Sequence, residues 1–106
     1  MTDKTKYSFC KRLTGDLYKT LPIYEGEDIN GKVIANPFDA HENYLKHLII
    51  LEAELNGAYE YYGDDAFLSM LLLVKGMKKI DIGNHRDVKD CVFKLIKMSE
   101  GISNGI

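Results

Sequence analysis

The sequence has no tryptophan, only two cysteines and two prolines, and no long apolar run. Its longest apolar stretches, residues 48–51 and 67–74, fall far short of the roughly 18 residues that a membrane-spanning helix needs. It also has no arginine-rich or apolar leader. We therefore expect a soluble, cytoplasmic protein with no membrane partner, and the length of 106 residues predicts a single domain, 1–106.

The two cysteines, Cys10 and Cys91, both fall on helical faces that we expect to be buried. We interpret them as two reduced, buried thiols, because disulfides are rare in reducing compartments. A Cys10–Cys91 bridge stays open as an alternative if the first and last helices are neighbours.

Motifs for catalysis, phosphate binding and metal binding are absent as well. His41 and Glu42 match the first half of a zinc-protease motif, but the second histidine would have to stand where the chain has Leu45. His47 lies on another helical face, and we expect it, His41 and His85 to be exposed to solvent. Such scattered ligands do not make a tetrahedral site. The sequence therefore predicts no enzyme activity, no cofactor and no metal.

Helical periodicity is the main feature that is present. Apolar residues recur at steps of three and four in four segments, which predicts four amphipathic helices. We expect the first from Tyr7 to Leu21, after a frayed segment 1–6, with Pro22 ending it. Gly15 indicates a kink, a close crossing or a break in this helix. The predicted fold class is all-α (mainly), a four-helix bundle-like domain.

The second helix is the longest, and its ends have clear signals. Asn36 is suited to cap it, Pro37 fits its first turn, and Gly63 is a natural left-handed terminator. Gly57 inside it indicates a close helix crossing. Its expected buried stripe is Tyr44, Leu48, Leu51, Leu55, Ala58 and Tyr62.

The third and fourth helices follow after short turns. We expect Asp64 or Asp65 to cap the third helix, which is apolar over more than half its circumference and should be the most central. Its expected buried face is Phe67, Met70, Leu71, Val74 and Met77. Asn84 should cap the fourth helix and Gly101 should stop it.

Residues 22–36 lack helical periodicity. The Asn30-Gly31 pair predicts a tight turn, and hence a short β-hairpin or hairpin-like loop between helices 1 and 2. An isolated ribbon is marginally stable, so we expect Ile29, Val33 and Ile34 to lean on the helices. A plain crossover between distant helices is the alternative.

Charge is unevenly distributed along the chain. Residues 1–20 have a net charge of +3, residues 21–65 carry ten acidic and two basic side chains for −8, and residues 66–106 return to +3. One interpretation is that these are ordinary solvated faces; the functional hypothesis is an acidic surface that docks on a basic protein partner. Its expected residues are Glu25, Glu27 and Asp28 of the loop, and Glu60, Tyr61, Asp64 and Asp65 at the end of the long helix. The predicted function is a small non-enzymatic binding module, by analogy an adaptor, inhibitor or immunity-type accessory protein of bacterial or phage origin.

Two other functions stay open. The C-terminal helices could bind DNA as a helix-turn-helix through Lys78, Lys79, Arg86 and Lys89. A single arginine among these residues and a pI of about 5.9 disfavour nucleic-acid binding. A structural homo-oligomer is the other alternative, with a second chain covering the excess apolar surface of the third helix.

Overall fold

The computed structural model describes residues 2–105, with side chains from residue 4 onward. It contains four helices: α1 (Thr2–Tyr24), α2 (Pro37–Tyr62), α3 (Asp65–Met77) and α4 (His85–Asn104). Within residues 2–105 there is no strand. The predicted all-α class with four helices is therefore confirmed.

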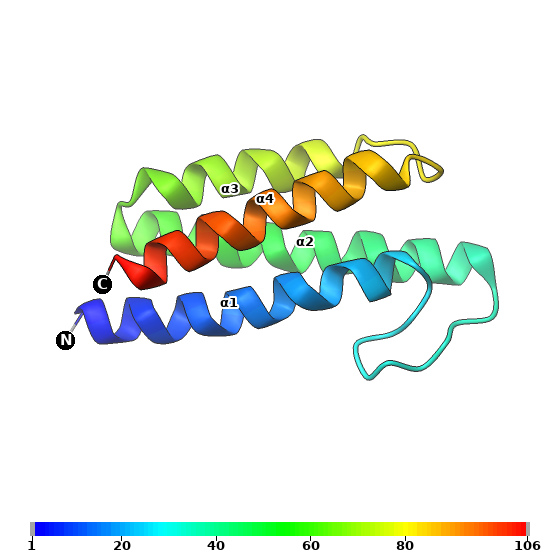
Figure 1. Cartoon of the computed structure of the whole chain (residues 1–106), viewed down its shortest axis with the longest axis horizontal. Helices are drawn as coiled ribbons and strands as arrows, with labels where there is room; N and C mark the ends of the chain where they lie inside the picture. Colours follow the sequence, from blue (N-terminus) through cyan, green and yellow to red (C-terminus); the bar gives the residue numbers. More distant parts are fainter. Residues whose placement is uncertain (1, 106) are drawn as a thin grey trace.

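The four helices run alternately up and down the long axis of a molecule of 44 × 25 × 20 Å (Figure 1). α1 packs mainly on α4 and α3 mainly on α2, while α1–α2 and α3–α4 contacts complete a ring of four neighbours. Both termini and the α2–α3 turn lie at one end, and the α1–α2 and α3–α4 loops lie at the other (Figure 1).

Each helix contributes its predicted apolar stripe to one core. The side chains are buried at the inner face and exposed on the outer face, as the 3.6-residue period requires. The largest fully buried side chains include Leu13, Leu17, Leu48, Leu51, Leu55, Phe67, Met70, Val74 and Leu95. None of the four helices, as far as the chain is described, is both long enough and apolar enough to cross a bilayer.

The predicted limits of α1 were wrong at both ends. The helix begins at Thr2 and continues through Pro22 to Tyr24. Proline costs about 3 kcal/mol inside a helix. Pro22 lies in the last turn of α1, so few backbone hydrogen bonds of the helix lie beyond it. Continuing the helix buries Ile23, which is worth about 1.5–3 kcal/mol and offsets much of that cost.

Three glycines do not have the predicted roles. α1 passes through Gly15 without a break and α4 passes through Gly101 to Asn104. A Cβ added at Gly15 or Gly57 would meet no atom within 4 Å, so neither glycine marks a close crossing. Each is tolerated because one glycine costs only about 1 kcal/mol in a packed helix.

α3 is not the most central helix. Its predicted inner face is buried, but like every helix of the ring it contacts two neighbours, and Leu72 on its outer side is 59% exposed. The high hydrophobicity of α3 therefore comes from apolar side chains on its outer face as well as on its buried face.

Both cysteines are free. Cys10 is buried opposite Ser99, whose hydroxyl donates to the Cys10 carbonyl at 3.2 Å. Cys91 is half-buried and precedes Ser99 by two turns of α4, or about 12 Å. The alternative of a Cys10–Cys91 bridge is therefore wrong, because the two thiols lie at different heights in the bundle.

Candidate interaction surface at the α1–α2 loop

The loop between α1 and α2 folds back on itself. Asp28 N donates to Lys32 O at 2.8 Å, Gly31 N donates to Asp28 O at 3.0 Å, and Gly31 has φ +83°. This is a three-residue turn with a left-handed glycine at its end, where the sequence predicted a two-residue Asn-Gly turn. A single antiparallel bridge joins Glu27 to Val33, and a two-stranded hairpin is not shown.

Side chains and backbone groups fix this loop in place. The Asp28 carboxylate accepts hydrogen bonds from the backbone N–H groups of Asn30 and Lys32, at 2.8 and 2.9 Å. Ile34 N donates to Gly26 O at 2.7 Å, and Asn43 of α2 reaches the Glu27 carbonyl at 3.4 Å. These bonds pre-organise the loop before any partner arrives, which lowers the entropy cost of binding.

An aromatic cluster supports the base of the loop. The Tyr24 ring packs edge-on against Tyr44 and His85, with centroids 5.0 and 5.2 Å away. The Tyr24 hydroxyl donates to the Ile82 carbonyl, which ties α1 to the α3–α4 loop. Burial raises the pKa of Tyr44 to about 12, so its hydroxyl stays protonated. No spacing pattern in the sequence predicts this cluster, because its members come from three helices.

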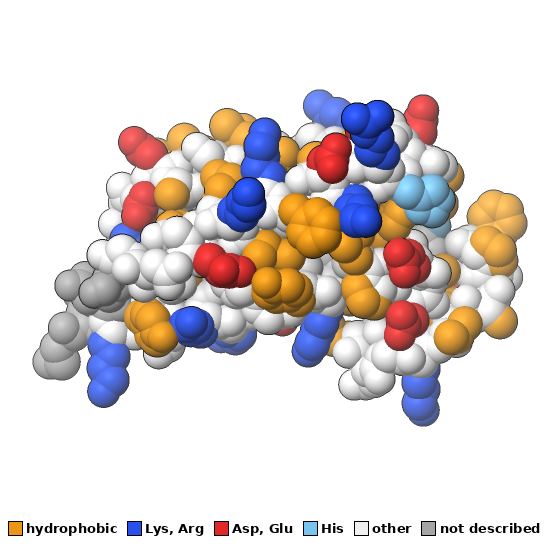
Figure 2. Space-filling model, in the orientation of Figure 1, with side chains coloured by type: hydrophobic (Ala, Val, Ile, Leu, Met, Phe, Trp, Pro, Cys, Tyr) orange, Lys and Arg blue, Asp and Glu red, His pale blue; other side chains and the backbone are white. Residues whose placement is uncertain are grey.

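The loop and the start of α2 expose their apolar side chains. Ile29 is 53% exposed, Val33 81% and Phe38 85%. The prediction that Ile29 and Val33 lean on the helices was therefore wrong, whereas Ile34 is half-buried. Figure 2 shows apolar side chains gathered at this end of the molecule. Exposed apolar groups on an ordered loop are typical of a binding site.

Acidic side chains surround these apolar groups. Residues 25–42 contain five acidic side chains and one basic side chain, Lys32, for a net charge of −4. Glu42 pairs loosely with Lys46 at 3.5 Å. We call this assembly the loop surface, made of Glu25, Glu27, Asp28, Ile29, Val33, Phe38, Asp39 and Glu42.

A hollow of about 290 Å³ adjoins the loop surface. It is lined by Ile23, Ile29, Asn43, Lys46, His47 and Ile50. Its walls are mainly aliphatic, so it is suited to hold one apolar side chain of a partner. A second hollow of about 270 Å³ lies on the other side of the loop, beside His41 and Ile82.

The other predicted acidic residues lie at the opposite end of the bundle. Glu60, Tyr61, Asp64 and Asp65 stand at the α2–α3 turn, about 39 Å along α2 from its start. They cannot share one surface with the loop. Tyr61 is 73% exposed against the edge of Tyr62.

Asp64 has a structural task. Its carboxylate accepts from Ala66 N at 2.9 Å, which caps α3, and lies 2.7 Å from Lys6 Nζ. The Lys6 hydrogen bond, followed by that of Ala66, holds the pKa of Asp64 below its usual range. Asp64 therefore stabilises the fold. Of the four residues predicted at this end, Glu60, Tyr61 and Asp65 are exposed.

The four basic residues proposed for DNA binding do not form a reading helix. α3 and α4 run antiparallel along the bundle (Figure 1), whereas helix-turn-helix motifs need helices that cross steeply. Lys78 is paired with Glu52 at 2.6 Å, and Lys89 lies 5.8 Å from the centre of the Phe93 ring. Lys79 and Arg86 are exposed, but the helices that carry the four residues do not cross steeply.

His47 was wrongly predicted to be exposed. It is buried between α1 and α2, with Nε2 2.8 Å from Thr20 Oγ1. His85 is exposed and His41 is half-buried. Across the described side chains, no three His, Cys, Asp or Glu residues gather closely enough to hold a metal ion.

Sequence reasoning also missed Phe38. The signal was available, because Phe38 lies off the buried stripe that runs from Tyr44 to Ala58.

The chain matches no known protein-family model, no curated protein and no solved structure. The function must therefore be inferred from the geometry and chemistry of the chain itself.

Proposed function

We propose that the protein is a non-enzymatic protein-binding module that docks its loop surface on a basic partner. The observation that supports this most is the exposure of Val33, on a loop held in place by hydrogen bonds, and of Phe38, in the adjoining first turn of α2, among acidic side chains. A protein gains nothing in stability by fixing a loop that leaves its largest apolar groups in water. Binding a partner gives this arrangement a use.

The two kinds of group would contribute differently. Phe38 and Val33 would act as anchors, since burying each contributes about 1.5–3 kcal/mol. Glu25, Glu27 and Asp39 would steer a basic partner toward the loop and speed association at low salt. The expected partner surface is a basic rim around an apolar pocket.

The shape of the loop, the cellular setting and the kind of partner site complete the proposal. The loop acts as a hairpin-like element, supported by the Glu27–Val33 bridge. The free thiols Cys10 and Cys91 fit a reducing, cytoplasmic setting. An inhibitor or adaptor that occupies a basic groove, including one built for nucleic acid, is the role that best suits an acidic apolar tip.

Charge reversal with a matched control tests the proposal. E25K/E27K changes the loop by four charges and leaves Asp28, which the loop needs for its fold. E60K/D65K makes the same change at exposed sites at the opposite end of the bundle. The tagged proteins would be used to capture a partner from cells, and the affinity for that purified partner measured at low and high salt.

We expect E25K/E27K to weaken binding on the order of tenfold or more at low salt, and E60K/D65K to bind like the wild type. High salt should weaken the wild-type complex. Equal losses in both variants, or binding that salt strengthens, would contradict the proposal. Circular dichroism of each variant checks that the helices are intact.

A further inference from the structure

The outer face of α3 carries a stripe of four residues: Asp65, Leu68, Leu72 and Lys75. Their spacing of three, four and three positions is that of one seam of a coiled coil. Asp65, Leu72 and Lys75 are exposed and Leu68 is half-buried. α3 therefore presents a seam to solvent on the side opposite its buried face.

The order of side-chain types along this seam is self-complementary in an antiparallel pair. An acid stands at the N-terminal end, two leucines in the middle and a base at the C-terminal end. A twofold rotation about an axis midway between Leu68 and Leu72 brings Asp65 onto the position of Lys75. Two antiparallel copies would then set each Asp65 against a Lys75 and each Leu68 against a Leu72. A parallel pair would set like charges together.

We propose that the chain forms a symmetric dimer in which α3 packs antiparallel against α3 of a second copy. A twofold interface uses the same patch on both copies, which is what this seam offers. The charges at the two ends of the leucine pair are opposite and equally spaced, which is the charge complementarity that an antiparallel second copy requires.

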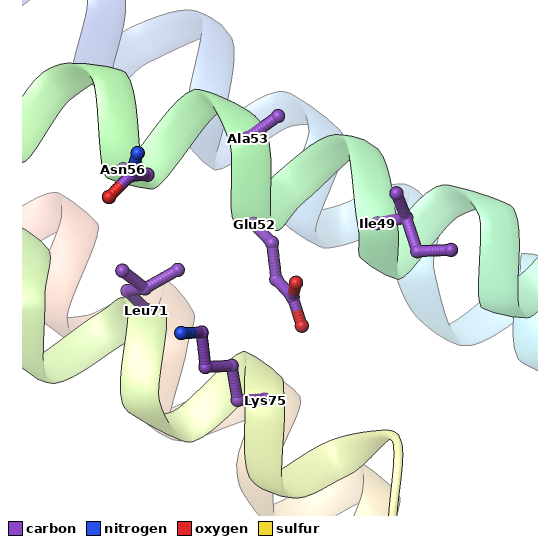
Figure 3. A pocket seen from close by; sticks show the side chains of 6 residues that line it. All are labelled: Ile49, Glu52, Ala53, Asn56, Leu71 and Lys75. Carbon is purple, nitrogen blue, oxygen red and sulfur yellow. The ribbon is translucent and has the colours of Figure 1, made fainter.

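The neighbouring groove extends the contact surface. A hollow of about 370 Å³ between α2 and α3 is lined by Ile49, Glu52, Ala53, Asn56, Leu71 and Lys75 (Figure 3). Glu52 is already paired with Lys78, whereas Lys75 has no ion pair among the described residues. Lys75 is therefore available for the Asp65 of a second copy.

The seam is short, so the dimer is expected to be weak. α3 has 13 residues and is about 20 Å long, which places the contact among small interfaces, below about 1,200 Å². The dimer should populate at high protein concentration and weaken in high salt. The loop surface stays open, because it lies at the end of the bundle and shares no residue with the seam.

Molar mass measured by light scattering or sedimentation, over about a hundredfold range of concentration, tests the dimer. The wild type should move from monomer to dimer as concentration rises. L72D places a charge at the centre of the seam and should remain monomeric. F93D, at an exposed apolar site on α4 (46%), is the matched control and should dimerise like the wild type.

Charge exchange tests the antiparallel pairing itself. D65K and K75D should each be monomeric alone, because each sets like charges across the seam. Mixed in equal amounts they should form a heterodimer, since every lysine of the D65K chain then meets an aspartate of the K75D chain. The double variant D65K/K75D should dimerise again by itself.

Several results would overturn the dimer. They are a wild-type monomer at every concentration, an L72D dimer as stable as the wild type, or a mixture of D65K and K75D that stays monomeric. A dimer lost in V33S/F38S and kept in L72D would move the contact to the loop surface. The first three results do not bear on partner binding by the loop surface, which E25K/E27K tests, so the two proposals fail separately.

Discussion

Thr20 and His47 join α1 to α2 in the interior of the bundle, with Oγ1 and Nε2 2.8 Å apart. The Thr20 hydroxyl donates its proton to the Asp16 carbonyl at 3.1 Å. With that proton committed, His47 Nε2 must carry a hydrogen and donate to Thr20 Oγ1. His47 therefore acts as a donor through Nε2 and links the two helices.

This contact makes stability depend on pH. Burial lowers the pKa of His47 below its usual 6.5, with Lys19 acting the same way and Asp16 partly opposing it. The unfolded chain then binds more protons between pH 6.5 and the lower folded pKa, so stability falls on acidification through this window. Burial and Asp16 raise the pKa of Glu54, with Arg12 opposing, which gives an effect of opposite sign above its usual 4.5.

Urea unfolding at about pH 7.5 and about pH 5.5 measures this dependence. H47Q keeps a donor for Thr20 but cannot titrate, so it should flatten the slope. H85Q changes an exposed histidine and should leave the slope as it is in the wild type. A slope that survives H47Q would contradict the role of His47.

Ser99 is a second buried polar contact, between α1 and α4. It is fully buried, its Oγ lies 2.7 Å from Thr14 Oγ1, and both hydroxyls reach the Cys10 carbonyl. S99A should cost about 1 kcal/mol of unfolding free energy, because Thr14 still satisfies the carbonyl. S69A, on an exposed part of α3, should change stability by less than about 0.5 kcal/mol in the same urea titration.

Asp64 gives a third prediction, on the start of α3. D64A removes both the cap and the Lys6 pair, and should cost about 1–2 kcal/mol. D64N keeps a capping oxygen and should lose less, while D65A should lose less than about 1 kcal/mol. Because the folded pKa of Asp64 is below its usual 3.8, its stabilisation should vanish as pH falls through that lower value. Equal thermal midpoints for D64A and D65A would refute this.

Gly31 controls the shape of the loop. Its φ of +83° is unfavourable for residues with a side chain, so G31A should add about 1–2 kcal/mol of local strain. The strain should appear as faster proteolysis within the loop and weaker partner binding, with the helices unchanged. G83A, at a glycine without positive φ, is the control; cleavage of both variants at the same rate would speak against a pre-organised loop.

The ends of α2 were predictable from the sequence because their determinants are local. Asn36 Oδ1 accepts from Phe38 N at 2.8 Å, and Gly63 ends the helix with φ +68°. The end of α1 was not, because local proline chemistry competes with the burial of Ile23. The burial of His47 depends on α1, which no pattern within α2 reveals.

The candidate site was predictable only in part. The acidic character of the loop is visible in Glu25, Glu27 and Asp28. Sequence order did not show that residues 60–65 lie at the far end of the bundle, since that follows from the length of α2. The exposure of Val33 also depends on how the turn at Gly31 orients it.

Site-specific photo-crosslinking tests partner binding by the loop surface most directly. A photoreactive phenylalanine analogue would replace Val33, Phe38 or Tyr61 in turn, since all three side chains are highly exposed and Tyr61 lies at the opposite end. Positions 33 and 38 should crosslink to the same protein in cells, lysates irradiated in high salt should not form the adduct, and position 61 should not form it under either condition. An adduct formed only from position 61, or no adduct from either loop position, would contradict partner binding by the loop surface.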